Sequence, residues 1–256
     1  MSARYRFFVQ PVESIIRRFF KSRGYEIIKV ASDYPPEEWE VIQQVKPYTG
    51  TSIERISGLI GIVKYLSRNK IEGDFVECGV WRGGSMMAAM LALKQLGDTS
   101  RHFYLYDTYE GMTPPTEKDK TFDGKKAVDL LNATEKREGP TYWCIASLSD
   151  VKKNVYSTGY PQDKIHFIQG RVEDTLPAQL PGKIALLRLD TDWYESTHHE
   201  MVHLYPLLAP HGALILDDYG YWDGSRRAVD EYFAQQPFAP FLGKLDFSGR
   251  IAIKPR

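Results

Sequence analysis

The feature that most constrains the fold of this chain is a series of short, almost continuously apolar runs, each followed by a stretch of helical periodicity. Runs of this kind indicate strands that are buried on both faces of a parallel sheet. Their regular alternation with helices is typical of a doubly wound α/β domain. The predicted strands span residues 74–80, 103–107, 165–169, 184–190 and 213–217, and the predicted helices span 52–66, 85–96, 150–156, 196–208 and 226–235.

The last part of the chain follows a different pattern. The runs FLGKLD and RIAIKP are joined by the tight turn Phe247-Ser248-Gly249, which predicts an antiparallel hairpin at one edge of the sheet. A parallel sheet closed by such a hairpin is typical of the Rossmann-like fold of class I methyltransferases, which use S-adenosylmethionine (SAM). It is less typical of a dinucleotide dehydrogenase. The predicted fold class is therefore α/β, of the methyltransferase kind.

Two segments fall outside this alternation. Residues 1–50, broken by prolines at positions 35, 36 and 47, are predicted to form an N-terminal extension of helix and loop before a domain at 51–256. Residues 111–143 are too polar for a core and too long for an ordinary connection, which predicts a lid or a mobile excursion. Because the segment follows the second strand, at the edge where such sheets bind ligands, the lid is favoured.

Within the extension, residues 12–23 have an apolar stripe at helical spacing, which includes Val12, Ile15, Phe19 and Phe20, among basic side chains. A basic amphipathic helix can lie on an anionic membrane. Surface helices of globular proteins usually have such a stripe too. We therefore expect it to pack on the body of the protein or on a second subunit, and we expect a homo-oligomer.

The composition excludes several classes of protein. Lys plus Arg and Asp plus Glu both number 33, so the formal net charge is zero and nothing indicates a nucleic-acid partner. Cys78 and Cys144 have no metal or redox spacing. No apolar run approaches about 18 residues and the first residues lack a signal-peptide core. We therefore expect a cytoplasmic enzyme without a membrane partner.

A strand–turn–helix segment, ECGVWRGGS, carries the predicted cofactor site. It leaves a buried strand, turns through glycines that let the backbone approach a ligand, and opens a helix whose amides can hold a carboxylate. The segment is not GxGxxG, so the usual dinucleotide fingerprint is absent. Asp107 ends the next strand, where an acid can bind both ribose hydroxyls. These features favour a SAM site over a purely structural corner, with the residues Glu77, Gly79, Gly83, Gly84, Ser85, Asp107, Gly170 and Arg171.

Four carboxylates follow the fourth and fifth strands: Asp190, Asp192, Asp217 and Asp218. All are expected at the carboxyl edge of the sheet, where open α/β folds bind their ligands. Carboxylates gathered there repel one another unless a cation neutralises them, and hard oxygen ligands suit Mg²⁺. The alternative is that they cap the following helices, which accounts for one or two of them but not for their convergence.

The segment HEMVH, from His199 to His203, matches the HExxH helix of zinc proteases. The extended form of that motif is missing, and Pro206 breaks the helix directly afterwards. A zinc protease also needs a third protein ligand and a bound water. The protease is therefore a remote alternative, and both histidines are expected on an exposed or partly buried helix face.

Several separated motifs together resemble the macrocin O-methyltransferase (TylF) family, whose members methylate deoxysugars on macrolides and related antibiotics. The motifs span about residues 49–233 and are DFVECGVWRGGSMMAAM, YLYDTYEGM, VEDTLP, LRLDTDWYESTHHEMVHLYPLL and GALILDDYG. The resemblance implies a SAM-binding domain, a Mg²⁺ site at Asp190, Asp217 and Asp218, and a general base at Asp192. It also implies antibiotic biosynthesis, with a glycosylated small molecule as the acceptor.

The predicted reaction is methyl transfer from SAM to a sugar-like hydroxyl. Such a hydroxyl is a poor nucleophile near neutral pH, and a bound metal can lower its pKa. Asp192 is expected to take the proton, with His198 as the competing base. Two other classes stay open: a catechol-type O-methyltransferase that acts on an aromatic diol, and a non-enzymatic SAM- or nucleotide-binding module, which the convergent carboxylates disfavour.

Overall fold

The computed structural model describes residues 16–23, 33–139 and 141–256, which belong to two compact units. In the first unit, Met1–Pro35, residues 16–21 are helical, and Ile16, Phe19 and Phe20 are exposed. Val12 and Ile15 lie outside the described residues, so the amphipathic stripe and its partner stay predictions. In the described ranges, no helix combines the length and the apolarity that a membrane span requires.

The second unit, Pro36–Arg256, is built on a seven-stranded sheet of order β3-β2-β1-β4-β5-β7-β6. Strands β1 to β5 are parallel, whereas β7 runs antiparallel to both β5 and β6. This confirms the predicted parallel sheet with an antiparallel C-terminal hairpin. The strands are β1 (Asp74–Cys78), β2 (Phe103–Asp107), β3 (Ile165–Gln169), β4 (Ile184–Leu189), β5 (Leu208–Leu216), β6 (Gly243–Lys244) and β7 (Arg250–Ile253).

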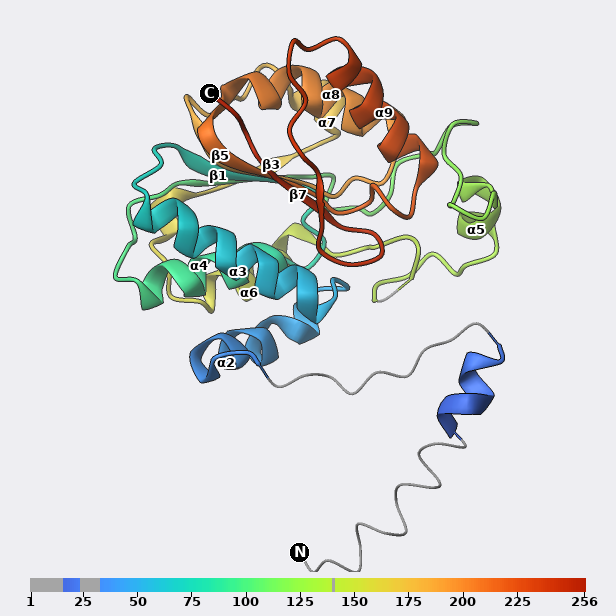
Figure 1. Ribbon diagram of the computed structural model, residues 1–256, viewed down its shortest axis with the longest axis horizontal. Coiled ribbons are helices and arrows are strands. Elements are labelled where there is room, and N and C mark those ends of the chain that lie inside the picture. The colour runs from blue at the N-terminus through green and yellow to red at the C-terminus, as the bar shows by residue number, and fades with distance from the viewer. Residues whose placement is uncertain (1–15, 24–32, 140) are drawn as a thin grey trace, which may run out of the picture. The chain divides into compact units, whose positions relative to one another are not determined.

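Helices cover both faces of this sheet (Figure 1). On one face lie α2 (Pro36–Val45), α3 (Ile53–Arg68), α4 (Gly84–Gln95) and α6 (Leu148–Tyr156), and on the other α7 (Val172–Thr175), α8 (Tyr194–Leu204) and α9 (Asp223–Ala234). The short helix α5 (Ala127–Asn132) lies apart from both layers (Figure 1). Single 3-10 turns are η1 (Lys46–Tyr48), η2 (Gln162–Lys164) and η3 (Tyr205–Leu207).

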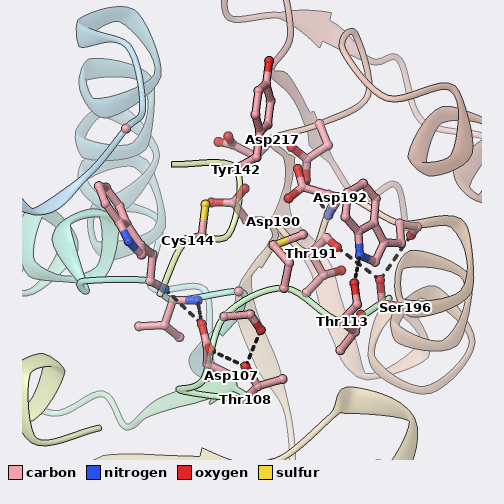
Figure 2. Close-up of a pocket in the computed structure, with 18 of the residues that line it drawn as sticks. Asp107, Thr108, Thr113, Tyr142, Cys144, Asp190, Thr191, Asp192, Ser196 and Asp217 are labelled. Atoms are coloured by element: carbon pink, nitrogen blue, oxygen red, sulfur yellow. Dashed lines mark hydrogen bonds between the residues drawn. The ribbon is translucent and has the colours of Figure 1, made fainter. Parts of the chain in front are cut away.

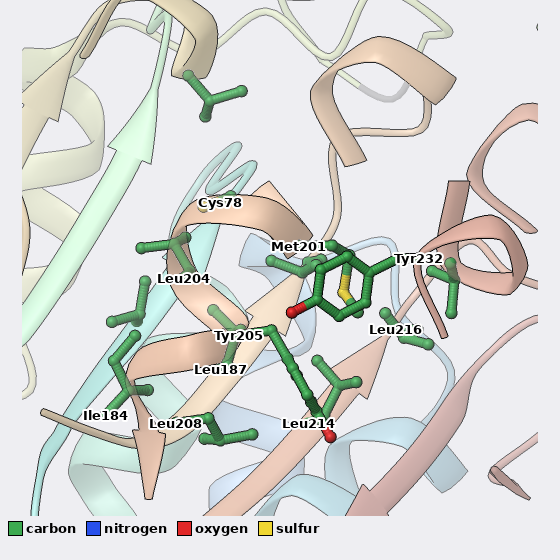
Figure 3. Packing of buried hydrophobic residues seen from close by; sticks show 14 of the residues in the cluster. Cys78, Ile184, Leu187, Met201, Leu204, Tyr205, Leu208, Leu214, Leu216 and Tyr232 are labelled. Carbon is green, nitrogen blue, oxygen red and sulfur yellow. The ribbon is translucent and has the colours of Figure 1, made fainter. Parts of the chain in front are cut away.

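One apolar core lies between the sheet and helices α8 and α9. Leu187 and Leu214 from the strands gather there with Met201 and Leu204 of α8 and Tyr232 of α9 (Figure 3). Shortening a large buried side chain of this kind to alanine typically costs about 2–5 kcal/mol. This core therefore fixes the strand ends from which the candidate site emerges.

Several boundaries differ from those predicted, and three differences are large. The helix predicted at 196–208 ends at Leu204, and Pro206 lies in a 3-10 turn from which Leu208 enters β5, five residues before the predicted start at 213. Helix α2 falls in the predicted extension, yet Val41, Ile42 and Val45 are fully buried. The compact unit therefore begins at Pro36, before the boundary predicted at residue 51.

Candidate active site

The carboxyl ends of the parallel strands open into a cavity of about 760 Å³. The strand order reverses between β1 and β4, and this reversal is where doubly wound sheets bind ligands. All four predicted aspartates line the cavity, as do five of the eight predicted cofactor residues: Gly79, Ser85, Asp107, Gly170 and Arg171. The structure thus brings most of the predicted residues together.

Asp107, the last residue of β2, holds the turn that follows β1. One carboxylate oxygen accepts hydrogen bonds from the N–H groups of Val80 (2.6 Å) and Trp81 (3.0 Å) (Figure 2). The other accepts from the Tyr109 N–H (2.7 Å). Burial raises the pKa of Asp107, and these N–H donors counteract the rise. A carboxylate has about four acceptor sites. The Thr108 hydroxyl lies 3.4 Å from the second oxygen but donates its shorter bond, 2.7 Å, to the Gly111 carbonyl, so Asp107 can hold the turn and still accept from one hydroxyl in the cavity.

The glycines of this turn are required by contacts within the protein. Gly79 has φ 80°, and a side chain there would meet the backbone oxygen of Asp190 at 1.8 Å. Gly83 and Gly84 do not line the cavity, and side chains there would collide with Val155 and Tyr48. Contact with α6 is one reason for glycine at position 83, and the approach of its backbone to a ligand stays a prediction.

Glu77 also lies outside the cavity lining, with 1% of its surface exposed. Its Oε1 accepts a hydrogen bond from Nη1 of Arg188 at 2.7 Å, and no group among the described residues bonds to Oε2. Burial raises the pKa of Glu77 to about 7. The structure therefore gives Glu77 a buried arginine as its partner, and Glu77 is not among the residues that line the cavity. Its place in the cofactor site stays a prediction.

Arg188 is a site residue that the sequence reasoning missed. It is the last but one residue of β4 and is 3% exposed, and its guanidinium contacts Glu77 at 2.7 Å, Asp190 at 2.7 Å and Asp217 at 2.5 Å. Arg55 of α3 pairs with the other oxygen of Asp217. An arginine within an apolar strand was the available signal, since arginine is almost never fully buried unless it is paired.

Three carboxylates form a cluster in the cavity. Asp190, Asp192 and Asp218 each offer an oxygen, and these oxygens lie within 4.8 Å of one another. It is the single such group of acidic, histidine or cysteine side chains in the described part of the chain. The structure thus brings together Asp190 and Asp218 of the predicted metal set with Asp192, whereas Asp217 is bound by Arg188 and Arg55.

Asp192 has an unusual backbone. Its φ of 66° is rare for a residue with a side chain, and its N–H donates to Oδ2 of Asp218 at 3.1 Å (Figure 2). Burial raises the pKa of Asp192 to about 7, and burial together with the neighbouring aspartates also raises the pKa of Asp218. An aspartate with a pKa near 7 is a stronger base than an ordinary one.

The insertion at 111–143 is anchored to the segment after β4. Oδ1 of Asp119 (1% exposed) accepts from the Tyr194 N–H at the start of α8 (2.8 Å), and the Thr113 carbonyl accepts from Nε1 of Trp193 (2.9 Å) (Figure 2). The buried residues Ala127 and Leu131 of α5 pack on Trp193 and Trp222. The first part of the insertion is thus fixed against the site, and its opening and closing stay a prediction.

The HEMVH segment lies on α8 but does not form a metal site. Glu200 is fully buried and its Oε1 accepts from the Thr191 hydroxyl at 2.9 Å. Nε2 of His199 lies 3.2 Å from the Leu176 carbonyl oxygen. Among the described residues, no third ligand gathers with His199 and His203. The predicted partly buried position of both histidines is confirmed.

Fold and site together define the class. A sheet of this order with a cavity at its reversal and an acid at the end of β2 is the architecture of a class I SAM-dependent O-methyltransferase. The chain belongs to the macrocin O-methyltransferase (TylF) family, whose model matches residues 29–251. This membership overturns the zinc-protease alternative and the non-enzymatic binding module.

Known relatives agree with this assignment. The chain is 33% identical over 202 residues to the 8-demethyl-8-(2,3-dimethoxy-alpha-L-rhamnosyl)-tetracenomycin-C 4'-O-methyltransferase of Streptomyces olivaceus, covering 79% of this chain and 74% of that one. It is 31% identical over 202 residues to the mycinamicin III 3''-O-methyltransferase of Micromonospora griseorubida, covering 79% and 76%. Among solved structures, the O-methyltransferase NovP superposes with a TM-score of 0.71 at 28% identity, covering 82% and 83%.

Proposed function

We propose that this enzyme methylates a sugar hydroxyl of a glycosylated natural product, in antibiotic biosynthesis, with help from a divalent cation such as Mg²⁺. The observation that carries the proposal is the cluster of Asp190, Asp192 and Asp218 in the same cavity as Asp107. The names of the relatives support the acceptor class, because one acts on a rhamnosyl tetracenomycin and another on mycinamicin III.

The cofactor end of the cavity suits SAM. Asp107 would accept from the ribose hydroxyls, and Ser85 and the first amides of α4 would hold the carboxylate of the methionine part. Gly170 and Arg171, after β3, complete this end. Nε1 of Trp81, a residue that lines the cavity, is buried and has no acceptor among the described residues. An unpartnered buried donor of this kind is what a ligand site leaves open.

The carboxylate cluster suits a hard cation because all of its donors are oxygens. Asp190 and Asp218 are the ligands on which sequence and geometry agree. Asp217, the third ligand that the family resemblance implies, would have to exchange an arginine contact to reach an ion. When bound, the ion supplies positive charge that favours the ionised form of an acceptor hydroxyl.

Asp192 is the proposed general base. It takes the proton from the acceptor hydroxyl as that oxygen forms its bond to the methyl carbon and the carbon–sulfur bond of SAM breaks. The oxygen that Asp192 offers beside Asp190 and Asp218, in the cavity that holds Asp107, supports this role. His198, the competing base, does not line the cavity, and its ring stacks on Tyr194 with centroids 5.8 Å apart.

Release of S-adenosylhomocysteine (SAH) from the purified enzyme tests the proposal. We expect release with alkyl and aryl rhamnosides, loss of activity after chelation, recovery with Mg²⁺, and poor recovery with Zn²⁺. Full activity after exhaustive chelation would contradict the metal. Release with catechol but with none of the glycosides would support the catechol-type alternative.

The natural acceptor and the assembly are tested separately. Mass spectrometry of a strain that lacks this protein should show a glycosylated metabolite lighter by one methyl group. Light scattering on the purified full chain should show a homo-oligomer, as the sequence predicts. A monomer would remove the second subunit as a partner for the helix within residues 12–23.

A further inference from the structure

Four aromatic side chains at the cavity have no role in the proposed chemistry. Phe122 and Tyr142 belong to the insertion, Tyr221 follows β5, and Phe247 lies between β6 and β7. Tyr142, Tyr221 and Phe247 line the cavity, and Phe122 packs on two of these rings. We call these four residues the aromatic rim.

The rings of the rim form one cluster with edge-to-face and tilted contacts. Phe122 and Phe247 have ring centroids 5.2 Å apart at an interplanar angle of 76°, and Tyr221 lies 5.9 Å from Phe122 and 6.0 Å from Phe247. The hydroxyls of Tyr142 and Tyr221 lie 3.2 Å apart. Three segments distant in sequence therefore present a single aromatic face with two hydroxyl groups at its side.

This face is open although its backbone is held in place. Phe122, Tyr142 and Phe247 are 56%, 42% and 59% exposed. The Phe122 N–H donates to the Tyr221 carbonyl at 2.8 Å, and Oδ1 of Asp246 accepts from the N–H groups that follow Phe247, at 2.9 and 2.7 Å. These contacts do not use the phenyl rings. The exposed rings are thus not needed to hold their own turns.

The rim is continuous with the reacting centre. The N–H groups of Tyr221 and Trp222 both donate to the Asp218 carbonyl at 2.9 Å, and Trp222 packs on Trp193, which follows Asp192, with centroids 5.0 Å apart. In Figure 2, Asp190 lies between Asp107, at the cofactor end, and Tyr142 of the rim. An acceptor with its hydroxyl at the aspartates and SAM at Asp107 would extend its remaining part toward the rim.

We propose that the aromatic rim binds the aglycone of the acceptor through an apolar ring face, so that the enzyme selects aryl glycosides over small alkyl glycosides. Aromatic rings pack favourably on other rings, and each large ring that loses water contact contributes strongly to binding. The inference rests on the proposed sugar acceptor. It adds the chemical class of the group attached to that sugar.

Calorimetric titration of the SAH-saturated enzyme with methyl and naphthyl α-L-rhamnopyranoside tests the rim. We expect the naphthyl glycoside to bind about tenfold more tightly. In Phe122→Ala and Phe247→Ala this ratio should fall toward one, while affinity for SAH and for the methyl glycoside stays unchanged. Phe238→Ala is the matched control, because Phe238 is 74% exposed and does not line the cavity. It should keep the full ratio.

Equal affinities in the unaltered enzyme, a ratio that survives in both rim variants, or no binding of the naphthyl glycoside would each overturn the rim as an aglycone site. Methyl transfer in the same samples, followed by SAM turnover, reports on the proposed function separately. Rim-dependent binding without methylation of any sugar hydroxyl would refute the proposed function and leave the rim standing. Methylation of both glycosides at equal affinity would support the proposed function and overturn the rim as an aglycone site.

Discussion

The two ends of the cavity are built in different ways. At the cofactor end, Asp107 and the turn after β1 come from neighbouring parallel strands, and hydrogen bonds from backbone N–H groups of the turn to the Asp107 carboxylate fix them. At the acceptor end, the aromatic rim comes from three segments of the chain that only tertiary folding brings together. The difference teaches that the cofactor site can be predicted from the periodic pattern of the strands. The proposed acceptor site depends instead on contacts between the insertion and two turns.

Replacing Asp192, the proposed general base, should have the largest effect on catalysis. Asp192→Asn should lower kcat by about two to four powers of ten, because the amide cannot accept the hydroxyl proton. Steady-state kinetics measures this loss, and titration with SAH and Mg²⁺ should show nearly normal affinities. Asp129→Asn, at an exposed acid on α5, is the control.

Two outcomes would reassign these roles. A large loss of Mg²⁺ affinity in Asp192→Asn would make Asp192 a ligand, as its place in the carboxylate cluster permits. Normal turnover in Asp192→Asn together with an inactive His198→Ala would transfer the role of base to the histidine.

The two arginines that bind Asp217, the buried Arg188 and the partly buried Arg55, predict an effect on stability. Asp217→Asn leaves Arg188 and Arg55 without a shared partner, and losing one member of a buried ion pair costs about 3–5 kcal/mol. We expect the lower part of this range, because Arg188 keeps Glu77 and Asp190 and Arg55 keeps Asp246. Denaturant unfolding without added metal measures it.

Asp246→Asn is the matched control for this measurement, because Asp246 pairs with the more exposed Arg55 alone. It should cost clearly less. Equal losses in the two variants would show that the buried arginine network at Asp217 contributes no special stability.

Much of the fold could be predicted because strand burial leaves a local signal. The predicted β2 and β3 match their observed bounds, since continuous apolar runs end at polar residues there. The start of β5 was missed because Leu208, Ala209 and Pro210 follow directly on a helical pattern. Its position depends on pairing with Ile184 across the sheet, which no local pattern shows.

The candidate site divides in the same way. Asp107 and Asp190 end strands, so their convergence in the cavity followed from topology. The pairing of Asp217 with Arg55 and Arg188 joins side chains from α3, β4 and the end of β5, and depends on the directions of side chains at strand ends. The aromatic rim forms where three segments of the chain meet. The local sequence of each segment does not show that it contacts the other two.

A smaller effect is expected at the cofactor end from Asp107→Asn. Loss of charge-assisted hydrogen bonds to the ribose should weaken SAH binding about tenfold to a hundredfold in calorimetry. The melting temperature should be recorded in parallel, because the same carboxylate holds the turn at Val80 and Trp81. Unchanged SAH affinity in a folded variant would remove Asp107 from the cofactor site.

The smallest effect concerns the insertion at the acceptor end. Trypsin should cut the free enzyme after Lys136 or Arg137, which are exposed, and only slowly at Lys118 and Lys120 beside the anchored Asp119. SAH with an aryl glycoside should slow the cuts at 136 and 137 by several-fold, if residues 133–139 close over the ligands. Unchanged cleavage with both ligands saturating would make this part a passive loop.

The insertion also has fixed ends. The Met112 N–H donates to the Trp143 carbonyl at 3.0 Å, so the backbone closes on itself where the segment leaves and rejoins the domain. The entropic cost of closing a loop rises by only about 0.6 kcal/mol when its length doubles. The exposed part after the anchored helix α5, residues 133–139, can therefore be lengthened, shortened or exchanged during evolution, or by grafting, with little effect on the folding of the transferase domain, whereas the anchored part around Asp119 and Leu131 cannot.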